Sequence, residues 1–346
     1  MVVACNSPAP SPAPIPTTAV SETTPISSNP NTAAGTPQST PTQNPLNAEL
    51  IDYTHKKLIY QLKIPVGWKV DEQESFAYIT APDESASIIV AGVNTGVELN
   101  ELGFANFVDA TELNNFARNK NYSQVDRMLD YKSWVAILHS TFDSSNIPQK
   151  ILSIYQREGN VVFYLIFQSN TDIYEKDSPL FDLIIHNAQF NSNNMAAIVP
   201  YNMVYDFSAP KNLFILEIPT NWTYQNNAIK NEILDRFISP DGHARIENIT
   251  YDDGNAITRF KADRIALQLL QEIYAKDARI DEAKTQPDLS IRWSWASAKN
   301  GIEGTTFYET RGTSFLMLTF FCDKDYKGIF NPLFNQLIET YRTIEG

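Results

Sequence analysis

The stretch Ile-Pro-Val-Gly-Trp at residues 64–68 returns as Ile-Pro-Thr-Asn-Trp at residues 218–222, 154 positions later. An aromatic strand then closes on Ala-Pro-Asp at 81–83 in the first copy and on Ser-Pro-Asp at 239–241 in the second, so the offset has grown to 158. The second copy therefore carries extra residues between these two landmarks. Solenoid repeats are roughly 20 to 50 residues long, so an offset of this length indicates a whole domain copied in tandem.

Later landmarks keep the two copies in step. Tyr-x-x-x-Gly at 155–159 recurs at 308–312, and Ser-Pro-Leu-Phe at 178–181 recurs as Asn-Pro-Leu-Phe at 331–334, both at an offset of 153. A Ser or Asn before a Pro is typical of a helix N-cap followed by the first helical position. Apolar residues then recur at helical spacing, so each copy is predicted to end in a helix capped by Ser178 or Asn331.

Alternating apolar and polar residues predict strands between these landmarks. The predicted strands are 58–64, 76–80, 86–93, 133–141, 149–157 and 161–168 in the first copy, and 213–218, 236–239, 244–250, 290–298, 304–310 and 314–321 in the second. A helix is predicted in the middle of each copy, because apolar residues near 107–117 and 266–274 are spaced for one helix face.

The sequence therefore predicts an α+β fold of two tandem α-β-α sandwich domains. Each would be an antiparallel sheet of about six strands that two helices cover. The predicted domains are 48–192 and 209–346, with a linker at 193–208.

Charge and hydropathy exclude some classes of partner. The net charge of −13 argues against nucleic acid, because binding to a phosphate backbone depends on Lys and Arg. No apolar run reaches the 18 or more residues of a membrane span; the longest, 315–322, has the length of a strand.

The N-terminal residues suggest a lipid anchor. Val-Val-Ala-Cys at residues 2–5 has the form of a bacterial lipobox, and we interpret residues 1–5 as the remnant of a signal peptide with Cys5 as the lipidation site. Residues 6–47 hold ten of the 20 prolines and a single charged residue, Glu22, which predicts a disordered tether. Two acyl chains on Cys5 would suffice for stable anchoring. The alternative is an ordinary disordered tail on a soluble protein.

Each copy resembles the PsbP-like superfamily in its Ile-Pro-x-x-Trp strand end, its Pro-Asp turn, its middle helix and its closing helix. With the lipobox and tether, the chain looks like bacterial lipoproteins of this fold, of the LpqN type. The resemblance covers about residues 55–192 and 209–345, and it implies a binding or assembly module without shared catalytic residues. Similarity of fold alone does not establish function.

Few residues suggest chemistry. The four histidines have no second His or Cys at ligand spacing, so we predict no metal site and no cofactor. Asp241 and His243 share a Pro-Asp-Gly turn that is more simply a solvated loop than a pair of ligands. Trp293 and Trp295 share one face of a strand, where core packing is the simpler interpretation and a platform for ligand stacking is the alternative.

Three hypotheses for function follow. The first is a non-catalytic, extracytoplasmic lipoprotein, anchored to the bacterial membrane through Cys5, that binds a protein or an envelope component. The second is a receptor for a small ligand, with a cleft between the domains or between sheet and helix, lined by Trp293 and Trp295. The third is an enzyme without a recognisable motif, which would require a cluster of titratable groups in a pocket.

Overall fold

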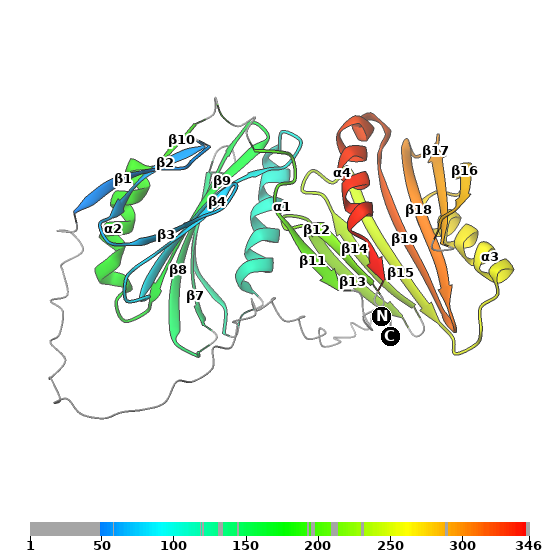
Figure 1. The fold of residues 1–346 in the computed structure, drawn as a ribbon, viewed down its shortest axis with the longest axis horizontal. Coiled ribbons are helices and arrows are strands. Elements are labelled where there is room, and N and C mark those ends of the chain that lie inside the picture. The colour runs from blue at the N-terminus through cyan, green and yellow to red at the C-terminus, as the bar shows by residue number, and fades with distance from the viewer. Residues whose placement is uncertain are drawn as a thin grey trace, which may run out of the picture.

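The structure is a computed structural model, and it describes residues 49–57, 59–117, 119, 121–130, 134–143, 145–191, 194, 198–208, 214–229, 232–287 and 290–343. Cys5 and the predicted tether, 6–47, lie outside the described residues. The described residues form two units that lie side by side (Figure 1). None of their helices is both long enough and apolar enough to cross a membrane.

The first unit contains two sheets and two helices. Its strands are β1 (Leu50–Thr54), β2 (Tyr60–Pro65), β3 (Lys69–Glu72), β4 (Phe76–Thr80), β5 (Ala86–Asn94), β6 (Ser123–Asp130), β7 (Trp134–Phe142), β8 (Pro148–Glu158), β9 (Val161–Asn170) and β10 (Gln189–Phe190). Its helices are α1 (Glu101–Glu112), which a π-helical turn extends over Leu113–Ala117, and α2 (Tyr174–Asn187).

The second unit repeats this series. Its strands are β11 (Val204–Ser208), β12 (Phe214–Pro219), β13 (Thr223–Ile229), β14 (Glu232–Ile238), β15 (Ala244–Asp252), β16 (Arg279–Thr285), β17 (Ile291–Ser297), β18 (Ile302–Arg311), β19 (Ser314–Asp323) and β20 (Arg342–Thr343). Its helices are α3 (Arg259–Leu269), with a π-helical turn at Leu270–Tyr274, and α4 (Lys327–Thr340), which follows a 3₁₀ turn at Lys324–Tyr326.

The two units have the same topology. The large sheets have the strand orders β3-β4-β5-β9-β8-β7-β6 and β13-β14-β15-β19-β18-β17-β16, and the small sheets have the orders β1-β2-β10 and β11-β12-β20. Adjacent strands are antiparallel throughout. The prediction of two tandem α+β domains, each with an antiparallel sheet and two helices, is confirmed by this arrangement.

The prediction of an antiparallel sheet of about six strands is close to the observed count, but the strands that form the sheet differ from those predicted. The strand that ends in Ile-Pro belongs to a separate three-stranded sheet, and each large sheet has seven strands. The edge strands β6 and β16 were missed because almost all of their residues are exposed, so they carry no apolar alternation. β11 lies inside the predicted linker, 193–208, and pairs with β12, which extends the second unit back to Val204.

The closing helices begin earlier than predicted. Pro179 and Pro332 each occupy the sixth position of their helix, so Ser178 and Asn331 are not N-caps, and neither helix has a side-chain cap. A proline at this position removes one backbone hydrogen bond. In α2 the Ser178 hydroxyl donates to the Glu175 carbonyl at 3.3 Å, which is the carbonyl that the missing N–H would have reached.

Helices cover both faces of each large sheet. In the first unit α2 and the small sheet cover one face, and α1 covers the other. In the second unit α4 and the small sheet cover one face, and α3 covers the other. The central strands β5, β9 and β19 are therefore buried along nearly their whole length, which explains why their sequences are almost continuous apolar runs. The central strand β15 is buried along most of its length but carries several polar residues.

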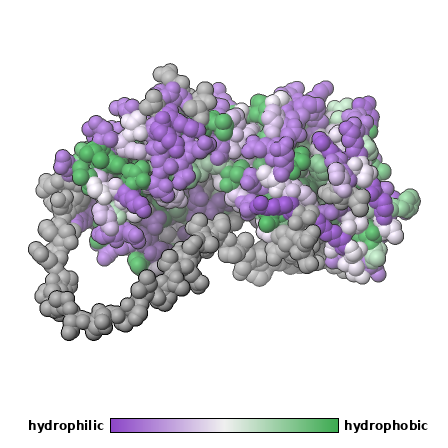
Figure 2. Space-filling view, in the orientation of Figure 1, coloured by the Kyte–Doolittle hydropathy of each residue, from purple (hydrophilic) through white to green (hydrophobic). Residues whose placement is uncertain are grey.

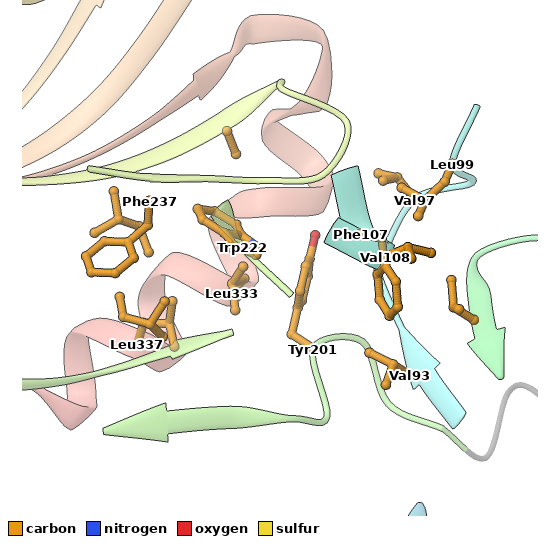
Figure 3. Packing of buried hydrophobic residues seen from close by; sticks show 14 of the residues in the cluster. Val93, Val97, Leu99, Phe107, Val108, Tyr201, Trp222, Phe237, Leu333 and Leu337 are labelled. Carbon is orange, nitrogen blue, oxygen red and sulfur yellow. The ribbon is translucent and has the colours of Figure 1, made fainter. Parts of the chain in front are cut away.

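One hydrophobic cluster joins the two units. The α1 face of the first sheet and the α4 face of the second belong to the same group of buried residues. Tyr201 lies between Phe107 of the first unit and Trp222 of the second (Figure 3), and its ring centroid is 6.1 Å from that of Phe330. Burial raises the pKa of Tyr201 well above its usual range, and the charge of Asp241 adds to this shift.

Polar contacts fix the same junction. Asn106 on α1 donates a hydrogen bond to the Pro240 carbonyl at 3.0 Å, and Asn114 in the π-helical turn after α1 donates to the Thr220 carbonyl at 2.8 Å. Asn202, between the units, donates to the Gly92 carbonyl at 2.9 Å. The α1 side of one unit thus contacts the α4 side of the next, with α2 and α3 outermost (Figure 1). Because the two units contact each other through different faces, they are stacked head to tail and are not related by a two-fold axis.

The visible surface is mostly hydrophilic over both units, and its apolar side chains form small, separate patches (Figure 2). Two of the most exposed apolar side chains, Leu102 and Phe260, occupy the same position on α1 and α3. Isolated apolar side chains of this kind are normal on a soluble surface and do not by themselves indicate a binding site.

Candidate functional site

A cleft in the second unit lies between α4 and the large sheet. Its volume is about 270 Å³, slightly below the roughly 300 Å³ at which typical ligand pockets begin. Its walls are mostly apolar and aromatic, and they come from β12, β18, β19, α4 and the residue that follows α4. These wall residues are Phe214, Phe307, Leu316, Phe320, Ile338 and Tyr341. We call this cavity the α4 cleft.

The amide of Asn248 lies in the wall of the α4 cleft, and it is almost completely buried. Its Nδ2 donates to Asp235 Oδ2 at 3.2 Å and lies 3.4 Å from Thr250 Oγ1. Its Oδ1 has no hydrogen-bond partner among the described residues. A buried acceptor without a donor costs about 1–3 kcal/mol, so this oxygen favours a ligand that carries an N–H or O–H group.

Asp235 determines which way the Asn248 amide points. Its carboxyl group is fully buried, and Oδ1 accepts from Tyr224 Oη and Asn226 Nδ2, both at 2.8 Å. Because a carboxylate oxygen cannot donate, Asn248 must turn its NH₂ group toward Asp235. The oxygen is then the end of the amide that is left without a partner.

One charged residue, Glu309, lines the α4 cleft. Glu309 Oε1 accepts from Tyr341 Oη at 2.8 Å and from Arg311 Nη2 at 2.9 Å. Nearby, the guanidinium of Arg292 lies 5.6 Å from the centroid of the Phe307 ring. Glu309 Oε1 thus already has two donors from the protein.

A different polar cluster is buried under α1 in the first unit. Glu112 Oε1 accepts from Tyr155 Oη at 2.7 Å, and Glu112 Oε2 lies 3.3 Å from His139 Nδ1. Burial raises the pKa of Glu112 and lowers the pKa of His139 to about 4, so the neutral form of each is favoured. The ring of Phe116 packs against that of His139, with 4.7 Å between the two ring centroids. None of these residues lines the α4 cleft.

Trp293 and Trp295 lie in the core of the second unit, on the face covered by α3. Their exposed fractions are 7% and 2%, and Trp295 Nε1 donates to Thr306 Oγ1 at 3.0 Å. This is the packing that the simpler interpretation predicts. A ligand could stack on either ring only if α3 moved away. The α4 cleft does lie between sheet and helix, but on the opposite face from both tryptophans.

The Asp241 turn is held by its own hydrogen bonds. Asp241 Oδ1 accepts from Ser239 Oγ at 2.5 Å and from the His243 amide at 3.1 Å. The His243 ring pairs with Asp323, 2.6 Å away, and stacks on Tyr326 at a centroid distance of 3.8 Å. Within the described ranges, no group of three or more His, Cys, Asp or Glu residues is arranged to hold a metal ion.

Sequence reasoning missed Asp235 and Asn248. Both lie on inward-facing positions of strands that pack under α4, and both would have appeared as polar residues in an otherwise apolar face. The sequence does show such a polar residue at 244–250, where Asn248 shares a strand face with the apolar residues Ala244 and Ile246. Periodicity identified the strand, but it did not show which polar residue would be left without a partner.

Neither a protein-family model nor a curated protein sequence matches this chain. Among solved structures, cyanobacterial PsbP from Synechocystis is 11% identical, with a TM-score of 0.33 over 42% of this chain and 94% of that one. A Pseudomonas aeruginosa protein of unknown function is 12% identical, with a TM-score of 0.27 over 38% of this chain and 91% of that one. A Bacteroides thetaiotaomicron protein is 10% identical, with a TM-score of 0.29 over 48% and 52%. Likenesses this weak carry no conclusion about function.

Proposed function

We propose that this protein is a non-catalytic binding protein whose second unit holds a small, largely apolar molecule in the α4 cleft. The observation that carries the proposal is an aromatic cleft with one unpartnered acceptor, Asn248 Oδ1, in its wall. Apolar walls with a few well-placed polar groups are the usual composition of small-molecule sites. The ligand class is an aromatic or alicyclic compound that carries a hydroxyl or N–H group.

The arrangement of titratable groups supports a binding role over catalysis. The carboxylate in the cleft, Glu309, already accepts hydrogen bonds from Tyr341 and Arg311. The cluster of Glu112 and His139 lies in the other unit, under α1. A general base must come within hydrogen-bonding reach of the substrate, and His139 is fully buried.

The proposal is tested by comparing two probes of nearly equal shape, 2-naphthol and naphthalene. Only 2-naphthol carries a donor for Asn248. We expect it to bind the native protein about tenfold more tightly, which is the effect of one hydrogen bond of about 1.4 kcal/mol. In Asn248→Leu the preference should vanish while naphthalene binding persists. Equal binding of both probes to the native protein would contradict the assigned role of Asn248.

A second pair of variants tests the position of the site. Ile338→Trp places a larger side chain in the α4 cleft and should abolish binding of both probes. Ile185→Trp, at the equivalent position on α2, is the matched control, because both isoleucines are partly buried against their cores. Binding that survives Ile338→Trp, or that is lost equally in Ile185→Trp, would place the ligand elsewhere. Circular dichroism checks that both variants fold.

We also propose that the chain is a bacterial extracytoplasmic lipoprotein of tandem PsbP-like domains, anchored through Cys5. The lipobox form of residues 2–5, the proline-rich segment 6–47 and the repeated α-β-α units support this interpretation. In this setting the partner is a protein or an envelope component. Membrane fractionation of a Cys5→Ser variant tests the anchor, which is wrong if the variant matures and fractionates like the native protein.

A further inference from the structure

A second cavity lies in the same unit, on the opposite face of the sheet from the α4 cleft. Its volume is about 190 Å³, and it is bounded by β14, β15 and β19 and by the π-helical turn after α3. A water molecule takes about 30 Å³ in the liquid, so the cavity has room for roughly six waters or one molecule of similar total size. We call it the α3 pocket.

The α3 pocket has a buried carboxylate with one oxygen unpartnered. Glu247 is 1% exposed, and its Oε1 accepts a hydrogen bond from Arg236 Nε on the neighbouring strand. Its Oε2 has no hydrogen bond of good geometry among the described residues. Burial raises the pKa of the Tyr274 hydroxyl, which lies close enough to this carboxylate for the charge of Glu247 to raise that pKa further, so a ligand would compete with Tyr274 for Oε2. Leaving a buried carboxylate oxygen without a donor is costly, so Glu247 favours a ligand that presents an N–H or O–H group.

The same pocket has one cation without a carboxylate partner. Arg236 is paired with Glu247, and His243 lies 2.6 Å from Asp323. Arg245, whose guanidinium lies 5.9 Å from the Phe321 ring centroid, forms no ion pair with a described residue. Glu247 and Arg245 lie on the same face of β15, two positions apart, so one acceptor and one cation face the same small space.

The equivalent positions of the first unit do not carry these groups. In the matching register Ile89 replaces Glu247, Tyr78 replaces Arg236 and Ser87 replaces Arg245. The shared topology therefore does not require the charged residues. They are a property of the second unit alone, which separates them from residues that serve the fold.

We propose that the α3 pocket binds a small zwitterion of amino-acid size, whose carboxylate pairs with Arg245 and whose ammonium group donates to Glu247 Oε2. Arg is well suited to carboxylates, because its planar guanidinium offers two parallel donors. The apolar side chains of Ile273, Ile302 and Phe321 complete the wall and leave space for a short apolar side chain.

Calorimetry with the full set of L-amino acids tests this proposal, with propionate and ethylamine as probes that carry only one of the two charges. At least one amino acid should bind, and both single-charge probes should bind at least about tenfold more weakly, since each lacks one charge-assisted hydrogen bond. Arg245→Gln and Glu247→Gln should each weaken amino-acid binding by at least about tenfold. Arg245 is only partly buried, so its variant should fold even if Glu247→Gln does not.

The matched control is Arg292→Gln, which removes an arginine that also lies over a phenylalanine ring but on the opposite face of the sheet. It should leave amino-acid binding unchanged. The two sites can therefore fail independently. The proposal is overturned if no amino acid binds, if propionate binds as tightly as the amino acids, or if Arg245→Gln binds like the native protein.

Discussion

The α1 face of the first unit and the α3 face of the second have the same backbone but different chemistry. The helix caps Asn100 and Thr258 align α1 with α3, and strand register aligns β7 and β8 with β17 and β18. At the end of the helix, Glu112 of α1 corresponds to Leu270, which follows α3. On the strands beneath, the corresponding pairs are His139 and Trp295, Ile151 and Gly304, Ser153 and Thr306, and Tyr155 and Tyr308.

The difference shows how one topology supports two kinds of interior. In the first unit the polar side chains Glu112 and His139 face each other and are closed off by aromatic rings. In the second unit Trp295 occupies that space, and the polar groups Glu247 and Asn248 lie beside cavities on the two faces of the sheet. The topology determines which positions of each strand face the interior of the unit. Whether a polar residue there becomes a site depends on whether its neighbours satisfy it.

The largest expected effect comes from Trp295→Ala. Trp295 is 2% exposed and donates to Thr306 Oγ1, so its removal leaves a large cavity and takes away one of the two hydrogen bonds of that hydroxyl, the other being to Thr319. We expect a loss of about 3–5 kcal/mol in the free energy of unfolding, measured by urea denaturation. The same measurement on Trp134→Ala, a half-exposed tryptophan on β7, is the control and should show a much smaller loss. Similar losses would mean that α3 does not pack on Trp295 as described.

The next largest effect is a pH dependence of stability that arises in the first unit. Burial lowers the pKa of His139 from 6.5 to about 4, so the unfolded chain takes up a proton at higher pH than the folded chain. The stability contributed by neutral His139 is therefore present above pH 6.5 and is lost as the pH falls toward 4. The loss should reach about 2–3 kcal/mol, since each pKa unit corresponds to 1.36 kcal/mol.

Two variants separate His139 from its neighbour. The pKa of Glu112 is raised by burial, so its protonation favours the folded state at low pH and partly offsets the histidine effect. Unfolding free energies measured between pH 6.5 and 4.5 should fall less steeply in His139→Gln than in the native protein, and more steeply in Glu112→Gln. Parallel curves for all three proteins would contradict the assignment.

Gly304→Ala tests whether Trp295 fits in the second unit because the neighbouring strand has a glycine there, where the first unit has Ile151. A Cβ at this position would lie 2.6 Å from the Phe320 carbonyl oxygen and 2.8 Å from the Trp295 ring. We expect a loss of about 1–3 kcal/mol from overpacking, again by urea denaturation. Ser153→Ala, at a buried position on β8, serves as a control in which a side chain shrinks without a clash. A neutral Gly304→Ala would show that the indole ring has free space.

The smallest effect is expected at Leu102 and Phe260, which share one position on α1 and α3. Their exposed fractions are 70% and 74%. Leu102→Ser and Phe260→Ser should each change the free energy of unfolding by no more than about 0.5 kcal/mol. A larger loss in only one of them would reveal a contact that distinguishes the outer surfaces of the two helices. Thermal denaturation of both variants side by side is sufficient for this comparison.

The sequence predicted the elements better than the sites. Apolar alternation located the central strands within a few residues, and the repeated landmarks identified the duplication. The edge strands β6 and β16 were missed because their exposed residues leave no periodic signal. Ser178 and Asn331 were misassigned as caps because a Ser or Asn before Pro also occurs inside a helix when an upstream turn begins it earlier.

The sequence by itself determined the two copies, their α+β class and the faces of their strands, because these depend on periodicity and turn chemistry over short stretches. Tertiary structure alone decided that the α1 side of one unit packs on the α4 side of the next, since that contact joins residues more than 100 positions apart, such as Asn114 and Thr220. It also decided that Asn248 and Glu247 keep unpartnered oxygens beside cavities. Whether a buried polar atom is satisfied depends on neighbours from other strands, which no local pattern contains.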